Sequence, residues 1–122
     1  MIYHSNGIDI LEVRRFKEIV LKNGHRFLKR IFRDNEVDYC EKKRNKYQHL
    51  AGRFAAKEAF FKALRTKKIR WRDVEIYNGD CGEPKIKIYE SYLSLVKERD
   101  IMLSISHSKD YAIAIVTILK CE

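Results

Sequence analysis

The helix-forming segment from Leu50 to Arg65 constrains the fold of this 122-residue chain more than any other stretch. It reads LAGRFAAKEAFFKALR, contains no proline and is rich in alanine, leucine, lysine and glutamate, so we expect a helix from about Tyr47 to Arg65. At about 100° per residue, its apolar side chains spread around nearly the whole circumference. A helix that is apolar on all sides is buried, so the rest of the chain must surround it.

The residues before this helix predict one strand and three short helical segments. We expect a strand over residues 2–11 and an apolar helical face from Val13 to Val20, which ends at Gly24. A second short helical face follows at residues 27–32. Asp34 is expected to cap a third helix that ends near residue 43.

The residues after the central helix alternate between apolar and polar side chains. Val74 and Ile76 precede the turn sequence Asn78–Gly82, and Ile86 and Ile88 follow it. Two alternating runs on either side of such a turn predict a β-hairpin.

One more helix and two strands are expected to complete the chain. The helix spans residues 90–99, and its apolar side consists of Tyr92, Leu93 and Val96. The strands span residues 102–107 and 111–119. Because the second strand has few polar positions, we expect it at the centre of a sheet or covered on both faces. The predicted fold class is therefore α+β, with antiparallel strands and packed helices.

Composition favours a single cytoplasmic domain over residues 1–122. The length suits one domain, and no apolar run approaches the roughly 20 residues of a membrane span. The first residues, MIYHSNGIDIL, lack the basic-then-apolar order of a secretory signal. Cys40, Cys81 and Cys121 are odd in number and far apart, so we expect unpaired thiols.

The net charge points to an anionic partner without identifying it. Lys and Arg number 26 against 17 Asp and Glu, which gives a formal net charge of +9. A small basic domain can bind nucleic acid, an acidic protein or a phosphate-rich small molecule. Charge alone favours nucleic acid.

Two acidic residues stand in apolar surroundings. Glu58 lies in the middle of the central helix, and Lys62 follows it by one turn. The two residues form either an ordinary ion pair along the helix or part of a functional site. Asp9, in the sequence Gly7–Ile10, lies near the end of the first strand, where it could instead cap a helix or form a turn. Two acids from separate elements could hold Mg²⁺, which leaves coordination positions for phosphate oxygens and water.

A histidine and three serines end the fourth predicted strand. Because side chains alternate along a strand, Ser104, Ser106 and Ser108 share one face and His107 points to the other. A histidine beside hydroxyls and backbone amides suits an anion, although a lone histidine is more often structural.

Three motifs in this order resemble the holo-acyl-carrier-protein synthases, the small 4′-phosphopantetheinyl transferases of fatty-acid biosynthesis. They are GIDI at residues 7–10, AGRFAAKEAFFKA at residues 51–63 and SISHSKDYAIAIV at residues 104–116. The resemblance covers essentially the full chain. It implies transfer of phosphopantetheine from coenzyme A to a serine of apo acyl carrier protein, with release of adenosine 3′,5′-bisphosphate.

The resemblance also implies roles for individual residues. Asp9 and Glu58 fall on the positions that hold Mg²⁺, and Lys62 falls on a phosphate-contacting lysine, so Glu58 and Lys62 are the catalytic candidates. Arg53 and His107 fall near the 3′-phosphate of the nucleotide, and Ser108 is a weaker neighbour. The base that deprotonates the acceptor serine stays open between Glu58, a metal-bound water and hydroxide.

The same resemblance implies two kinds of protein partner. Acyl carrier proteins are acidic, and an arginine at the position of Arg14 is expected to bind the carrier. The basic run Lys42–Lys46 is either a second docking surface or a solvated helix end. Relatives are homotrimers with active sites between subunits, so Asp9 and Glu58 are expected to meet His107 of another subunit.

The sequence differs from the family pattern just after the central helix, so two other functions stay possible. Where relatives have a glycine-containing turn after the central helix, this chain has Arg65 and Thr66. An inactive relative that binds coenzyme A without transfer therefore stays possible, as does a small nucleic-acid-binding domain. The latter lacks an RNP, GxxG or zinc-finger pattern.

Overall fold

The structure, a computed structural model, describes residues 2–121 and the side chains of residues 4–120. Its elements in chain order are β1 (Ile2–Glu12), α1 (Val13–Ile31), α2 (Asp34–Glu41), α3 (Lys46–Leu64), the 3₁₀ turn η1 (Trp71–Asp73), β2 (Val74–Asn78), β3 (Pro84–Ile88), α4 (Glu90–Val96), β4 (Asp100–His107) and β5 (Tyr111–Cys121). Within the described residues, no helix is long and apolar enough to cross a membrane.

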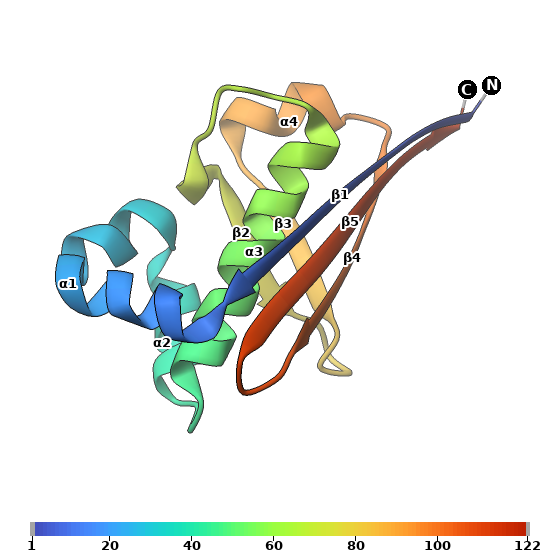
Figure 1. The fold of residues 1–122 in the computed structure, drawn as a ribbon. Helices are drawn as coiled ribbons and strands as arrows, with labels where there is room; N and C mark the ends of the chain where they lie inside the picture. Colours follow the sequence, from blue (N-terminus) through green and yellow to red (C-terminus); the bar gives the residue numbers. More distant parts are fainter. Residues whose placement is uncertain (1, 122) are drawn as a thin grey trace.

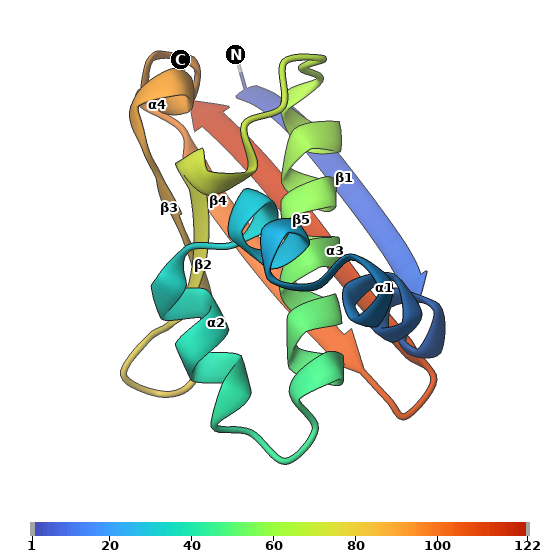
Figure 2. The same cartoon turned by 90° about the vertical axis from the view of Figure 1, so that its left-hand side faces the viewer.

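α3 is the centre of the molecule, as its sequence predicts. It packs between a three-stranded antiparallel sheet, in the order β1-β5-β4, and the β2–β3 hairpin, while α1 and α2 lie beside it (Figures 1 and 2). The hairpin and the central position of β5 are confirmed, and so is the α+β class.

The register of the sheet decides which residues face α3. Asp9 pairs with Ala114, which pairs with Ile105. Leu11, Ala112 and His107 form the next row. Ala112 and Ala114 are completely covered, so this is the face that packs on α3.

The opposite face of the sheet is not covered by any of the residues that the structure describes. Six large apolar or aromatic side chains on it are 37–62% exposed, namely Ile8, Ile10, Met102, Tyr111, Ile113 and Ile115. Of the two alternatives expected for β5, the structure shows the central position, with helices on one face of the sheet.

Two local expectations need correction, and one is confirmed. α2 begins at Asp34 itself, because Arg33 occupies the cap position and donates its backbone N–H to Glu36 Oε1 at 2.9 Å. α1 is interrupted at Gly24, whose φ of 65° and ψ of −149° are non-helical, so the expected stop at Gly24 and the second helical face at residues 27–32 are confirmed. Leu93 of α4 is 52% exposed, because this two-turn helix directs Tyr92 into the core instead.

A buried ion pair joins α2 to α3. Lys57 and Glu36 are both fully buried, and Lys57 Nζ lies 2.7 Å from Glu36 Oε1. The ammonium also donates to the carbonyls of Ile31 at 2.7 Å and Trp71 at 3.1 Å. The other carboxylate oxygen of Glu36 accepts the N–H of Ile76 at 3.0 Å. Four segments that are distant in sequence are thus held against α3.

Two of the three cysteines are free thiols, as expected. Cys40 is buried and Cys81 is exposed, while the side chain of Cys121 lies outside the described residues. Burial raises the pKa of Cys40 to about 11, so this thiol stays protonated at neutral pH.

Arg65 ends α3 in the left-handed conformation that usually belongs to glycine. Its φ and ψ are 58° and 40°, and its backbone N–H donates to the carbonyls of Phe61 and Lys62. The sequence departure at this position therefore preserves the helix-ending geometry and stores strain, because a side chain is disfavoured there.

Replacing this residue by glycine should stabilise the protein. We expect Arg65→Gly to raise the free energy of unfolding by roughly 0.5–1 kcal/mol, since relief of the left-handed strain exceeds the extra backbone entropy of glycine. Urea denaturation measures the change. Arg65→Ala is the matched control, because it removes the guanidinium and keeps the strain. A glycine variant less stable than the alanine variant would contradict the strain argument.

Candidate active site

A glycine allows β1 to lie directly against α3. A Cβ added to Gly7 would stand 1.8 Å from the carbonyl oxygen of Ala59 and 2.6 Å from the nitrogen of Ala63. Both are backbone atoms of the helix and cannot rotate away. Nearby, the hydroxyl of Ser5 donates to the carbonyl of Ala63 at 2.6 Å. This close contact fixes the position of Asp9, two residues further along the strand.

Asp9, Glu58 and Lys62 form the first group of site residues, which we call the carboxylate site. Lys62 Nζ lies 3.1 Å from Asp9 Oδ1 and 2.9 Å from the carbonyl oxygen of Ile8. Lys62 therefore pairs with Asp9 across elements rather than with Glu58 along its own helix. The alternative expected from the sequence, an ordinary ion pair between Glu58 and Lys62, is therefore not found among the described residues.

The electrostatics of the carboxylate site favour an added cation. Partial burial raises the pKa of Glu58 above its ordinary value, and the negative charge of Asp9 raises it further, while Lys62 opposes both. Two carboxylates that repel each other in this way gain from a divalent ion placed between them. Within residues 4–120, no group of three or more metal-ligand side chains occurs. Mg²⁺ needs only one or two carboxylates when phosphates and waters complete its shell.

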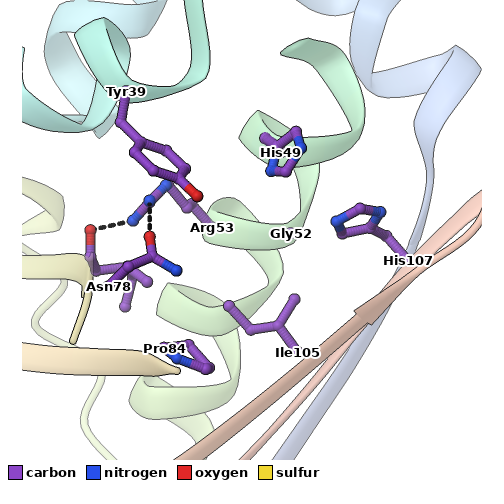
Figure 3. A pocket seen from close by; sticks show the side chains of 9 residues that line it. Tyr39, His49, Gly52, Arg53, Asn78, Pro84, Ile105 and His107 are labelled. Carbon is purple, nitrogen blue, oxygen red and sulfur yellow. Dashed lines mark hydrogen bonds between the residues drawn. The ribbon is translucent and has the colours of Figure 1, made fainter. Parts of the chain in front are cut away.

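Arg53 and His107 lie in a separate cavity of about 150 Å³, which we call the cationic pocket (Figure 3). Its walls come from α2, α3, the β2–β3 hairpin and β4, and none of the described residues that line it is a carboxylate. The lining residues are Tyr39, His49, Gly52, Arg53, Ile76, Asn78, Pro84, Ile105 and His107.

The guanidinium of Arg53 is held in a fixed position in this pocket. It donates to the carbonyl of Ile76 and, at 2.7 Å, to the Asn78 side-chain oxygen. It also lies over the ring of Tyr39, 4.4 Å from the centroid. Arg53 is 5% exposed, so its charge reaches solvent only through the pocket.

The two groups lie on different sides of α3. Arg53 and Glu58 are five positions apart, which is a rotation of about 140° around a helix. Asp9 belongs to β1 and His107 to β4, which are the two outer strands of the sheet. The chain therefore brings Asp9, Glu58 and Lys62 together, and Arg53 and His107 together, but it does not bring the two groups together.

Ser108 and Arg14 lie outside both groups. The hydroxyl of Ser108 accepts the N–H groups of Asp110 and Tyr111, each at 3.3 Å, and so shapes the turn between β4 and β5. Arg14 is exposed at the start of α1 and forms a loose pair with Glu18 at 3.4 Å.

Sequence reasoning missed several residues of the cationic pocket. His49 lies one helical turn before Arg53, so its 4-residue spacing from that arginine was a usable signal. Pro84, the sole proline in the sequence, begins β3 beside the pocket. Tyr39 and Asn78 gave no comparable signal, because their distance from Arg53 is set by the tertiary fold.

Comparisons with known proteins relate the chain to one family of enzymes. Residues 5–116 match the model of the 4′-phosphopantetheinyl transferase superfamily. The holo-[acyl-carrier-protein] synthase of Halothermothrix orenii is 47% identical over 115 residues, which are 90% of this chain and 92% of the relative.

Two solved structures are also similar along nearly their whole length. One is a holo-(acyl-carrier-protein) synthase from Bacillus anthracis in complex with CoA (3′,5′-ADP), with a TM-score of 0.78, 36% identity and 96% of each chain covered. The other is the Helicobacter pylori enzyme in complex with coenzyme A, with a TM-score of 0.82, 30% identity, and 93% of this chain and 98% of that one covered.

Gly7 offers a direct test of the contact that builds the carboxylate site. We expect Gly7→Ala to lower the free energy of unfolding by about 3 kcal/mol or more, because the added methyl group would overlap helix backbone. Thermal or urea unfolding measures the loss. Gly52→Ala is the control, since its new Cβ would meet a movable methyl group of Ile105 at 3.1 Å. Equal losses for the two variants would show that β1 can shift away from α3.

Proposed function

Because this chain belongs to the holo-[acyl-carrier-protein] synthase family of 4′-phosphopantetheinyl transferases, we propose that it transfers phosphopantetheine from coenzyme A to a serine of an acyl carrier protein. The observation that carries the proposal is the carboxylate site, where Asp9 and Glu58 converge from two elements beside Lys62. Such a site suits the pyrophosphate of coenzyme A. The nucleic-acid alternative rests on net charge alone, and an acidic carrier explains the same charge.

Asp9 and Glu58 are the residues that would hold Mg²⁺. The repulsion between their carboxylates fits an ion whose remaining ligands are phosphate oxygens and water. The ion would supply neutralisation of the negative charge that develops on the phosphates.

The chain's own residues would position the reacting groups. Lys62 Nζ, held by Asp9 and the Ile8 carbonyl, is placed to contact a phosphate oxygen near the carboxylates. The acceptor serine oxygen attacks the phosphorus next to the pantetheine group, and the pyrophosphate P–O bond to the nucleotide breaks. The serine proton passes to a base, for which Glu58 is one candidate. Adenosine 3′,5′-bisphosphate leaves.

The cationic pocket would take the nucleotide end of coenzyme A. Arg53 and His107 present positive or hydrogen-bonding groups to a phosphate, and Pro84 and Ile105 offer apolar surface beside them. Ser108 contributes by shaping the turn that follows His107.

A homotrimer would join the two groups of residues. The carboxylate site is at one edge of the sheet and His107 is at the other, so a head-to-tail ring would bring Asp9 of one subunit near His107 of the next. A cavity of about 390 Å³ beside Asp9 and Lys62 opens onto Ile8, Ile10 and Ile113 of the uncovered sheet face. Light scattering that gives a monomer mass with full activity would contradict the trimer.

A basic groove beside α1 would receive the acidic carrier. The groove, of about 540 Å³, runs between the start of α1, the α2–α3 connection and the β4–β5 turn. Five cations line it, namely Arg14, Lys17, Arg44, Lys46 and Lys109. We place the protein in the cytoplasm, where such carriers are modified, and treat residues 1–122 as one transferase domain.

The decisive experiment measures the mass of apo acyl carrier protein after incubation with this protein, coenzyme A and Mg²⁺. A mass gain of one phosphopantetheine group is expected. Binding of coenzyme A without any mass gain would favour an inactive relative.

Glu58→Gln should separate a metal ligand from a structural carboxylate. Without metal, we expect the variant to melt no lower than the wild type, because an amide costs less to bury than a carboxylate. With Mg²⁺ and coenzyme A it should lose most of the ligand-induced stabilisation, which is about 2.7 kcal/mol at a hundred times the Kd. Transfer should fall by orders of magnitude, and Asp9→Asn should behave alike.

Glu41→Gln on the surface of α2 is the control for loss of one negative charge. The metal assignment would be overturned by a Glu58→Gln protein that melts early and still transfers phosphopantetheine at a near-normal rate.

Arg14→Glu should impair use of the carrier more than use of coenzyme A. Surface charge mainly governs the encounter with an acidic partner and is screened beyond about 8–10 Å at physiological salt. We expect the KM for the carrier to rise several-fold, with a weaker dependence on salt than in the wild type. Lys97→Glu, outside the groove, makes the same charge change as a control. If only the KM for coenzyme A rises, α1 is not the docking helix.

A further inference from the structure

His49 is a pocket residue for which the proposed reaction has no assigned role. We infer that His49 binds the 3′-phosphate of coenzyme A together with Arg53 and His107, and that it selects the 3′-phosphorylated nucleotide over its 3′-dephospho form. The inference rests on the proposed placement of the nucleotide in the cationic pocket. It adds a specificity residue that lies in the first turn of α3.

The geometry brings two imidazoles to one side of the pocket. The ring centroids of His49 and His107 are 4.9 Å apart, and the rings meet edge to face at 68° (Figure 3). His49 comes from α3 and His107 from the end of β4, so their separation is fixed by the close packing of β4 on Gly52. Arg53 follows His49 by one helical turn. The three side chains thus surround a common space from two elements.

The groups around His49 are cationic or neutral. From α2 it faces Tyr39, at 6.1 Å between ring centroids. Lys43 from the segment after α2, Arg53 from α3 and His107 from β4 all lower its pKa electrostatically, after the larger lowering by burial. None of the described residues that line this pocket is a carboxylate. Burial and the neighbouring cations therefore favour the neutral form of His49 near pH 7, and the same cations favour an anion in the pocket.

A phosphate monoester matches that preference better than other parts of the nucleotide. It is largely a dianion at pH 7, with a second pKa of about 6, and offers three acceptor oxygens. Its charge would reverse the effect of the neighbouring cations and raise the pKa of His49. A site arranged to hydrogen-bond such a group rejects the analogue that lacks it.

The sign of the pH dependence follows from this change of pKa. His49 is neutral in the free protein and protonated in the complex, so binding takes up a proton between the two pKa values. Affinity for coenzyme A should therefore rise as pH falls from about 7.5 towards 6.5, by proton linkage. Below the phosphate pKa of about 6 the gain should level off, because the ligand itself becomes protonated.

The test is isothermal titration calorimetry with coenzyme A and with 3′-dephospho-coenzyme A, at pH 6.5 and 7.5 and in buffers of different ionisation enthalpy. The wild type should prefer coenzyme A and take up protons on binding it. In His49→Phe, which keeps a ring against His107, affinity for coenzyme A should fall roughly tenfold, the scale of one charge-assisted hydrogen bond. Affinity for the dephospho ligand should not change.

His49→Gln should retain part of the preference, because an amide can donate, but it should lose the corresponding share of proton uptake. His25→Phe, which lies outside this pocket, is the control for loss of a titrating histidine. Thermal melting of each variant confirms that the fold is kept.

The placement of the 3′-phosphate in this pocket and the role of His49 can be refuted separately. A wild-type protein that binds both ligands equally would overturn the placement of the 3′-phosphate in this pocket and, with it, the role of His49. A wild type that discriminates, with a His49→Phe variant that discriminates equally and takes up as many protons, would overturn the role of His49 alone.

Discussion

The buried ion pair between Lys57 and Glu36 holds the layers of this protein together. Its ammonium and carboxylate bind the end of α1, the N-terminus of α2, η1 and β2 to the middle of α3. Burial lowers the pKa of Lys57 to about 8, with Glu36 opposing the shift, so its ammonium is still largely charged at neutral pH. Burying two charges costs several kcal/mol before the hydrogen bonds offset it. The hydrogen bonds of the pair fix the positions of these four segments around α3.

The two halves of the proposed site depend on different contacts with α3. Glu36 accepts a hydrogen bond from the N–H of Ile76 in β2, and the carbonyl of Ile76 accepts one from the guanidinium of Arg53. The buried pair therefore helps to position Arg53 in the cationic pocket. The carboxylate site depends on a different contact, the close approach of β1 to α3 at Gly7. One helix thus carries two sets of ligands, each oriented by a different neighbour.

Periodicity predicted the central helix and the strands, and the family resemblance implied that Asp9 lies close to Glu58. Periodicity did not distinguish Lys57 from Glu58 as the fully buried charge. Both lie on a helix that is apolar all round, and only a partner 21 residues away decides between them. The sequence also did not identify His49 as a site residue, because its neighbour His107 belongs to a strand that is distant in sequence. The left-handed conformation of Arg65 could not be predicted from residue preferences, because these favour glycine in that conformation.

The first strand pairs with the last, and the side chains of Asn6 and Thr117 meet across 111 positions of sequence. Contacts of such long range slow folding, because the loop-closure entropy is lost before they form. During synthesis from the N-terminus, α3 and the hairpin emerge long before β5, which is the middle strand of the sheet. A nascent chain that ends before Tyr111 already contains Asp9, Glu58, Lys62 and His107, yet the strand that separates β1 from β4 is missing. The proposed ligand sites are therefore assembled only after β5 has been synthesised.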